Sequence, residues 1–206
     1  MKHLLRTLAI VAITCLNFPS YAGPFGLEQG MTLEQIKKIT QVNEWGNKSY
    51  FLYRAKSFPN GSNEVDIYTL LILPELGLCK VVADLKPVRT DPYGSELKAE
   101  FNLYVKLLSE KYGTSTKKID FLHANSIWKD SKYWMRSLEQ NERSLGHHWI
   151  SNKLIDSLAT VSVEAEATSL TSGKLSVTYD FKNMAKCQEV LEKSINKAKK
   201  ENVKNF

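Results

Sequence analysis

Apolar and polar residues alternate strictly along residues 159–166. Alanine and valine occupy every second position, threonine, serine and glutamate fill the positions between them, and residues 175–181 repeat the pattern after a Ser-Gly turn. Successive side chains of a strand point to opposite faces, so each segment is expected to be a strand. Together they predict an antiparallel hairpin with one buried face and one solvated face, and Glu164 and Glu166 lie on the solvated side.

Three earlier segments are also predicted to be strands. They are the aromatic run 50–53, the β-branched run 64–73 and the apolar run 78–85. Asn60-Gly61 is a hairpin-type turn between the first two. Pro74 ends the second strand because proline cannot donate a hydrogen bond to a β-ladder.

Helical spacing of apolar residues predicts four helices. At the start of the first, Thr32 and Gln35 can form a capping box, and Met31 and Ile36 form the matching hydrophobic staple. The second is expected between residues 91 and 113, where proline opens the helix and glycine stops it. Its buried stripe comprises Leu97, Phe101, Tyr104, Leu108 and Tyr112.

The third helix is expected over residues 131–147. Glu139 and Arg143 stand four residues apart in this segment, which is the favourable order for a helical ion pair. The fourth helix is expected to begin at about Asn183. Its inward residues are Met184, Cys187, Leu191, Ile195 and Ala198.

The predicted order is helix, three strands, helix, a short extended piece, helix, two strands, helix. This order is typical of an α+β fold in which an antiparallel sheet packs against helices. The chain has 206 residues, enough for one such domain or for two small ones. We therefore expect a single α+β domain over residues 23–206. The alternative is two similar lobes, 23–118 and 119–206, joined by a disulfide.

The first 22 residues have the pattern of a secretory signal peptide. Two basic residues precede the uncharged run 7–16, which is too short to span a bilayer. The small residues Ser20 and Ala22 fit the pockets of a signal peptidase, so we expect cleavage after Ala22 and a periplasmic or secreted mature protein. Lipidation of Cys15 is the alternative, although the residues before it lack the usual leucine and small residue.

Cleavage would leave Cys79 and Cys187 as the only thiols, in a compartment that oxidises thiols. Cys79 is expected to share a strand face with Val81 and Ala83, and Cys187 to lie on the inward side of the last helix. We predict a structural disulfide between them, for which a chain-entropy argument gives roughly 5 kcal/mol of stabilisation as an upper limit. The alternative, a redox pair or a metal site, lacks both Cys-x-x-Cys spacing and a neighbouring histidine.

The sequence lacks the motifs of common enzymes. It has no Gly-x-Ser-x-Gly elbow, phosphate-binding glycine loop, dinucleotide fingerprint or calcium loop. His123, His147 and His148 are the candidate metal ligands, but they lack the i, i+4 spacing of a helical zinc motif. The acids Glu164 and Glu166 are expected to be solvent-exposed. No catalytic residue, metal or cofactor is predicted.

The formal charge of the chain is +6, and lysines accumulate near its C-terminus. Proteins that track nucleic-acid phosphates combine clustered Lys and Arg with stacking aromatic residues. Here glutamates interleave with the lysines, so no nucleic-acid partner is expected. A solvated helix face is the simpler interpretation. The alternative is weak contact with an anionic membrane or cell-wall surface through Lys193, Lys197 and Lys200.

Residues 128–149 hold three of the four tryptophans. Aromatic residues and arginine are enriched where proteins bind one another, so this segment is a candidate binding surface. The residues that would form it are Trp128, Tyr133, Trp134, Arg136 and Arg143. Burial in the core is the alternative, because tryptophans at helical spacing commonly face inward.

Residues 25–36 read Phe-Gly-Leu-Glu-Gln-Gly-Met-Thr-Leu-Glu-Gln-Ile. This segment resembles the Gly-Met-Thr start of the first helix in SmpA/OmlA-type envelope proteins, and it is similar to β-lactamase-inhibitor-like domains. The resemblance implies helices packed on an antiparallel sheet, a secreted or periplasmic location, and binding of other proteins without catalysis. It covers this segment alone and transfers no functional residue.

We therefore expect an exported, non-catalytic binding protein of the bacterial envelope. It would act on another macromolecule, most simply an envelope protein, as an inhibitor, immunity factor or assembly factor. The first alternative is an envelope hydrolase with a non-standard site near His147 and His148. The second is a peripheral membrane or cell-wall binding protein that uses the basic C-terminal helix.

Overall fold

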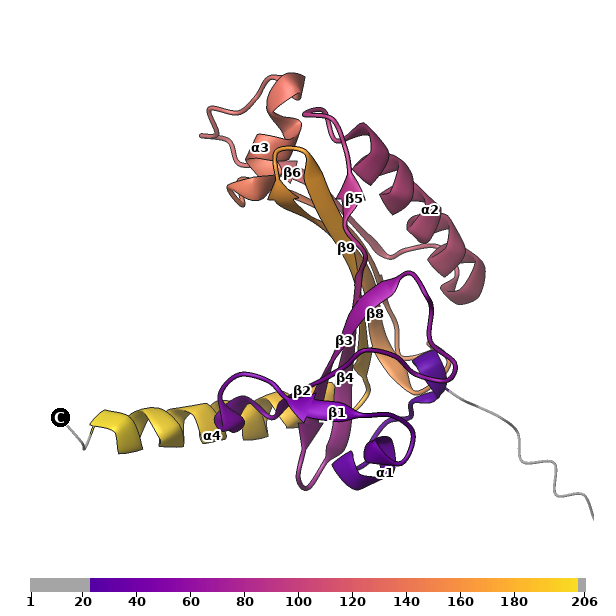
Figure 1. The fold of residues 1–206 in the computed structure, drawn as a ribbon, viewed down its shortest axis with the longest axis vertical. Coiled ribbons are helices and arrows are strands. Elements are labelled where there is room, and N and C mark those ends of the chain that lie inside the picture. The colour runs from indigo at the N-terminus through magenta and orange to yellow at the C-terminus, as the bar shows by residue number, and fades with distance from the viewer. Residues whose placement is uncertain (1–22, 204–206) are drawn as a thin grey trace, which may run out of the picture.

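The computed structural model describes residues 23–203, so the predicted signal peptide lies outside the described residues. Nine strands form one antiparallel sheet in the order β1-β2-β3-β4-β9-β8-β7-β6, with β5 beside β9 (Figure 1). The strands are β1 (Val42–Glu44), β2 (Leu52–Ala55), β3 (Val65–Leu73), β4 (Gly77–Leu85), β5 (Val88–Arg89), β6 (Lys117–Leu122), β7 (Arg143–Ile150), β8 (Leu158–Ser169) and β9 (Ser172–Phe181). The α-helices are α1 (Leu33–Lys37), α2 (Ser95–Tyr112), α3 (Trp134–Glu139) and α4 (Met184–Val203), and the 3-10 turns are η1 (Pro24–Gly26), η2 (Lys48–Tyr50) and η3 (Ser131–Tyr133).

The central strands β4 and β9 join the two halves of the chain. Their register pairs Val81 with Tyr179 and Ala83 with Val177. A boundary near residue 119 would separate β4 from β9, because β4 precedes that residue and β9 follows it. The two-lobe alternative is therefore wrong, and the chain forms a single sheet.

The main core lies on one face of the sheet, beneath α1, α2 and α3. Apolar residues from β3, β4, β8 and β9 meet Ile36 of α1, Phe101 of α2 and Met135 of α3 there. Figure 1 shows α2 lying along this side of the sheet, with α3 at one end and α1 at the other. The α+β class with helices packed on an antiparallel sheet is confirmed.

Local capping places the first two helices. The Thr32 amide donates to Gln35 Oε1 at 2.8 Å and the Gln35 amide donates to Thr32 Oγ1 at 3.3 Å, which confirms the capping box. α2 begins at Ser95 and not at Asp91, because the Asp91 carboxylate accepts hydrogen bonds from the amide and the hydroxyl of Ser95. The predicted stop at Gly113 is confirmed.

The predicted hairpin is confirmed as β8 and β9, with Glu164 and Glu166 exposed. The aromatic run 50–53, which was expected to be a strand, begins instead at the end of the 3-10 turn η2. Asn47 caps the turn η2 through a hydrogen bond from the Ser49 amide. Phe51 then adopts a left-handed backbone with φ of 52°, so β2 starts only at Leu52.

The helix predicted over residues 131–147 is wrong beyond residue 139. After α3 the chain turns at Asn141, whose φ is 56°, and continues as β7. β7 pairs with β6 on one edge and β8 on the other, and these two ladders override the helical spacing of the apolar residues. Glu139 consequently pairs with Arg136 at 2.9 Å and not with Arg143.

A β-bulge turns Cys79 to the face of the sheet opposite the main core. The ladder between β3 and β4 shifts register between Leu71 and Ile72, which leaves Cys79 as the extra residue of β4. Cys79 packs with Leu71 in a second buried cluster, whereas Val81 and Ala83 belong to the main core. The predicted shared face of these three residues is wrong, although Cys79 is fully buried.

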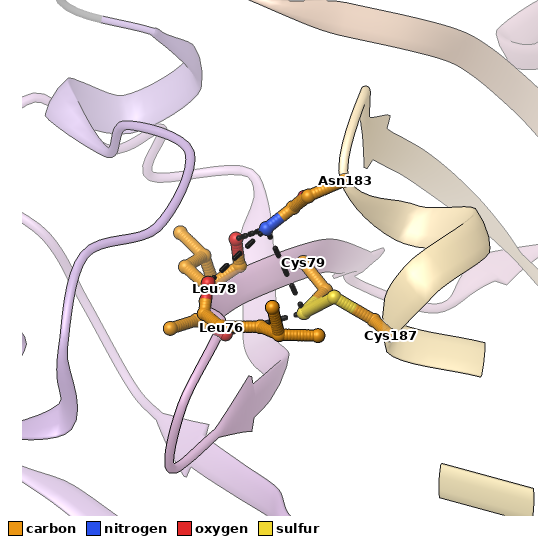
Figure 2. The surroundings of a disulfide bond; sticks show 6 residues. Leu76, Leu78, Cys79, Asn183 and Cys187 are labelled. Carbon is orange, nitrogen blue, oxygen red and sulfur yellow. Dashed lines mark hydrogen bonds between the residues drawn. A yellow bond between two sulfur atoms is a disulfide. The ribbon is translucent and has the colours of Figure 1, made fainter. Parts of the chain in front are cut away.

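The predicted disulfide between Cys79 and Cys187 is confirmed, with the two Cα atoms 6.4 Å apart (Figure 2). Asn183 reinforces this junction, because its side-chain amide donates to the carbonyls of Leu76 and Leu78 at 3.2 and 3.1 Å. The bridge and these hydrogen bonds attach the start of α4 to the β3–β4 hairpin.

Beyond this junction α4 extends away from the sheet, at the end opposite α3 (Figure 1). Leu191 packs on the disulfide cluster, whereas Ile195 and Ala198 pack against neither buried cluster, so the predicted inward stripe ends at Leu191. Within residues 23–203, no helix combines the length and the apolarity needed to span a bilayer.

Candidate binding site

A cavity of about 450 Å³ opens at the end of the sheet that carries α3. Four separate segments build it: the turn before α2, the loop after β6, the η3–α3 segment, and the turn between β8 and β9. We call this cavity the α3 pocket. Its walls are Pro92, Tyr93, Trp128, Lys132, Tyr133, Met135, Arg136 and Leu170.

Two aromatic rings from the sequence-predicted set form one wall of the α3 pocket. The rings of Trp128 and Tyr133 meet edge to face with centroids 5.3 Å apart, a favoured aromatic geometry. The Arg136 guanidinium lies 5.9 Å from the centre of the Trp128 ring, within range of a cation–π interaction. The structure thus brings Trp128, Tyr133 and Arg136 together at one site.

Short-range hydrogen bonds hold these side chains in place. The Trp128 amide donates to Ser126 Oγ at 3.1 Å, and the Lys132 amide donates to Asp130 Oδ1 at 3.0 Å, which caps η3. The Met135 amide donates to the Pro92 carbonyl at 3.1 Å. This last bond ties α3 to the turn before α2, so two walls of the pocket are fixed to each other.

Trp134, a sequence-predicted binding residue, does not line the α3 pocket. Only 5% of its surface is exposed, and it belongs to the main core. The Lys98 ammonium lies 4.2 Å from the centre of its ring, and burial lowers the pKa of Lys98. Trp134 is therefore a core residue next to the pocket residue Met135 and is not available to a partner.

Arg143, the fifth predicted residue, also lies away from the α3 pocket. It is the first residue of β7, where its Nε donates to Ser137 Oγ at 3.0 Å and its guanidinium pairs with Asp120 at 3.2 Å. The side chain is largely buried, so these contacts bind β7 to α3 and β6. Arg143 lines a different cavity, of about 340 Å³, beside Glu164 and Glu166.

Ion pairs neutralise both cations of the α3 pocket. Lys132 Nζ lies 3.4 Å from Asp130, and Arg136 donates to Glu139 at 2.9 Å. The hydrogen bond from the Lys132 amide holds the pKa of Asp130 below its ordinary value, so Asp130 remains ionised at neutral pH. The pocket therefore combines a mainly apolar wall with little net charge.

The apolar residues that extend this surface were not predicted from the sequence. Tyr93 and Leu170 line the pocket from turns distant in sequence, and 48% and 37% of their surfaces are exposed. Ile127, next to Trp128, is 76% exposed. The sequence did contain a signal for these positions, because large apolar residues inside polar turns are unusual. Only the folded chain, however, shows that they lie beside α3.

The two adjacent histidines of β7 point to opposite faces of the sheet. His147 packs against Phe101 of α2, with ring centroids 5.6 Å apart, and burial lowers its pKa. His148 lies on the other face, with Nε2 at 2.9 Å from Glu164. They do not share a pocket. Residues 23–203 also contain no group of three side chains arranged to hold a metal ion.

The α3 pocket offers ring faces, an aliphatic floor and two paired cations. These groups suit contact with an apolar side chain at the centre and with polar groups at the rim. Its walls supply phenol, ammonium and guanidinium groups but no paired nucleophile and base. No protein-family model, no curated protein and no solved structure matches this chain.

Proposed function

We propose that this protein is an exported, non-catalytic binding protein that takes an apolar side chain of another envelope protein into the α3 pocket. One observation carries the proposal: a formed cavity lies among the exposed side chains of Tyr93, Tyr133 and Leu170, with Ile127 beside it. Exposed apolar patches of this kind are typical of interaction surfaces. The bound partner would be inhibited, neutralised or assembled by the contact.

The composition and rigidity of the pocket support this function. Tryptophan, tyrosine and arginine are the residue types that contribute most to binding energy at protein interfaces. Buried Trp134 and the Met135–Pro92 hydrogen bond hold the walls in one arrangement. A wall that is already ordered loses little conformational entropy on binding, which favours affinity.

Two further observations support an envelope location. The disulfide Cys79–Cys187 is typical of proteins in oxidising compartments. The N-terminal sequence pattern predicts export. Both fit a partner that resides in, or passes through, the same compartment.

Affinity capture from envelope extract tests the proposal. The mature, oxidised protein serves as bait, and the variant Tyr133→Ala is compared with Tyr50→Ala. These two tyrosines are 39% and 40% exposed, but Tyr50 lies in η2, which contacts α4 at the other end of the sheet. Quantitative mass spectrometry measures what each bait retains, and circular dichroism checks that each variant is folded.

We expect one stoichiometric protein that wild type and Tyr50→Ala retain equally and that Tyr133→Ala loses at least tenfold, the effect of about 1.4 kcal/mol. Tyr93→Ala should lose it as well. If wild type, Tyr50→Ala, Tyr133→Ala and Tyr93→Ala all retain the partner equally, the interface lies outside the α3 pocket. Capture of nothing from an extract of adequate depth would contradict a stable protein partner.

A second function is favoured by the position of α4. Lys193, Lys197 and Lys200 line the same side of this helix, and the helix extends away from the sheet (Figure 1). A projecting row of cations can attract an anionic membrane or cell-wall surface. Such a contact would add to protein binding and would weaken as salt concentration rises.

A further inference from the structure

An enclosed carboxylate lies in the loop between β7 and β8. The side chain of Asp156 is only 9% exposed, and its Oδ2 atom accepts no hydrogen bond among the described residues. Lys111 Nζ lies 3.3 Å away but does not have hydrogen-bonding geometry, and half of the lysine side chain is exposed. A buried carboxylate with so little compensation destabilises the fold.

Burial and, in addition, the charge of Asp156 raise the pKa of Tyr112, so the Tyr112 hydroxyl lies near this carboxylate. The Tyr112 hydroxyl is enclosed and has no hydrogen-bond partner among the described residues. Asp156 and Ser157 both adopt left-handed backbone conformations, with φ of 60° and 57°. Such conformations are unfavourable for residues other than glycine and persist where the surrounding structure compensates for them.

Gly23 lies directly beside this loop. The residue is buried, and a Cβ atom added to it would stand 3.8 Å from Asp156 Cβ. The same Cβ would collide with the carbonyl oxygen of Leu27. The Leu27 carbonyl therefore requires glycine at position 23, and the Gly23 backbone lies within contact range of the Asp156 side chain.

We infer that Asp156 and Tyr112 form a binding site for the α-ammonium group of Gly23, which exists only after proteolytic removal of residues 1–22. A peptidase would hydrolyse the Ala22–Gly23 amide, and water would supply the hydroxyl of the new carboxyl group and a hydrogen of the new amine. The amine then binds a proton. This inference rests on the predicted cleavage after Ala22 and is independent of the α3 pocket.

The ammonium group supplies what the enclosed atoms lack. It adds a positive charge and carries three hydrogen-bond donors, whereas the peptide nitrogen of an uncleaved chain carries one. Asp156 Oδ2 and the Tyr112 hydroxyl can both accept from it. Export would thus be coupled to folding, because the chain gains its full stability only after cleavage.

A double-mutant cycle on the exported protein tests this inference. The full chain is produced with its own leader, and intact mass establishes whether the mature protein begins at Gly23. A second version carries one alanine inserted between Ala22 and Gly23, which moves the ammonium group by one residue. Asp156→Asn is made in both versions, and urea unfolding gives the equilibrium constant for each.

Asp180→Asn is the matched control. Asp180 Oδ1 is likewise enclosed without a hydrogen bond and has a lysine, Lys80, at 3.2 Å. Asp180 and its neighbour Tyr179 point to opposite faces of β9. Tyr179, and not Asp180, is on the face that contacts Phe25, two residues after Gly23. Asp180→Asn should therefore have the same effect in both versions.

We expect Asp156→Asn to raise the unfolding equilibrium constant roughly 10- to 100-fold in the protein that begins at Gly23, and much less in the version with the inserted alanine. Equal fold-changes in both versions, or a mature protein that begins elsewhere, would overturn the inference. If Asp156→Asn folds in neither version, the effect of Tyr112→Phe on the unfolding equilibrium constant is compared between the two versions instead. Its effect should again be larger when Gly23 is first, and equal effects would count against the site.

Discussion

Gly94 lies in contact with the indole ring of Trp134, at a distance that leaves no room for a Cβ atom. Gly94 is the N-cap of α2 and has a φ of 72°. Trp134 begins α3. The packing of these two residues fixes the start of α2 against α3, and the α3 pocket is lined by residues next to each of them, Tyr93 and Met135 among them.

Gly94→Ala is expected to destabilise the protein and to impair the α3 pocket. The added methyl group collides with Trp134 and also strains a left-handed backbone, and together these effects cost about 2–5 kcal/mol. Gly46→Ala is the control, because Gly46 has a φ of 75° and no atom near its Cβ position. It should cost about 1 kcal/mol from strain alone. Urea unfolding of both variants measures the difference, and equal losses would contradict the proposed packing.

Trp134→Ala is expected mainly to lower stability, whereas Trp128→Ala is expected mainly to weaken partner binding. Trp134 is buried, so its loss should lower the free energy of unfolding by roughly 3–5 kcal/mol. Trp128 is half-buried at the pocket wall, so its loss should reduce partner retention while costing less stability. Thermal unfolding and affinity capture of the two variants separate these effects. A larger stability loss for Trp128→Ala would contradict the assignment.

Features that depend on neighbouring residues could be predicted from the sequence. The capping box of Thr32 and Gln35 is complete within four residues, and the β8–β9 hairpin follows from alternation over adjacent segments. The disulfide joins residues far apart in sequence, but it was predictable because the expected loss of Cys15 with the signal peptide leaves two cysteines, which permit one pairing. The capping box and the hairpin need little information about distant parts of the chain, and the disulfide needs only the number of cysteines.

Features that depend on distant contacts could not be predicted. The apolar residues near Leu145 fit a helix, and only pairing with β6 and β8 makes this segment a strand. The bulge that reverses Cys79 arises from the register of β3 against β4. Tyr93 and Leu170 line the same pocket as Trp128 only because the turn before α2 and the β8–β9 turn lie beside α3. These two residues could therefore be assigned to the site only from the fold.

Removal of the disulfide is expected to lower the free energy of unfolding by about 2–5 kcal/mol. The double variant Cys79→Ser, Cys187→Ser also frees the start of α4 from the β3–β4 hairpin. Its α4 should be cleaved faster by a protease specific for lysine. A reductant should destabilise wild type to the same degree and leave the double variant unchanged. Unaltered stability of the double variant would show that the other contacts of α4 suffice.

Reversal of three charges on α4 tests attachment to anionic surfaces. Lys193→Glu, Lys197→Glu and Lys200→Glu together should greatly reduce co-sedimentation with phosphatidylglycerol vesicles at low salt. The control replaces the exposed lysines Lys117, Lys118 and Lys153 by glutamate. Because the interaction is electrostatic, wild type should also dissociate at high salt. Equal losses in both triple variants would indicate a general charge effect and not a surface on α4.

His147 is expected to make the fold sensitive to acid. Burial against α2, with smaller contributions from Lys118 and His148, lowers its pKa in the folded state. Its contribution to stability is therefore complete above the unfolded-state pKa of about 6.5 and is lost as pH falls below that value, because the unfolded chain binds a proton more readily.

His147→Gln should flatten the fall in unfolding free energy between about pH 7 and pH 5. His123→Gln, at an exposed position, is the control. Urea unfolding across this range measures both variants, and an unchanged slope for His147→Gln would assign the acid sensitivity to other groups.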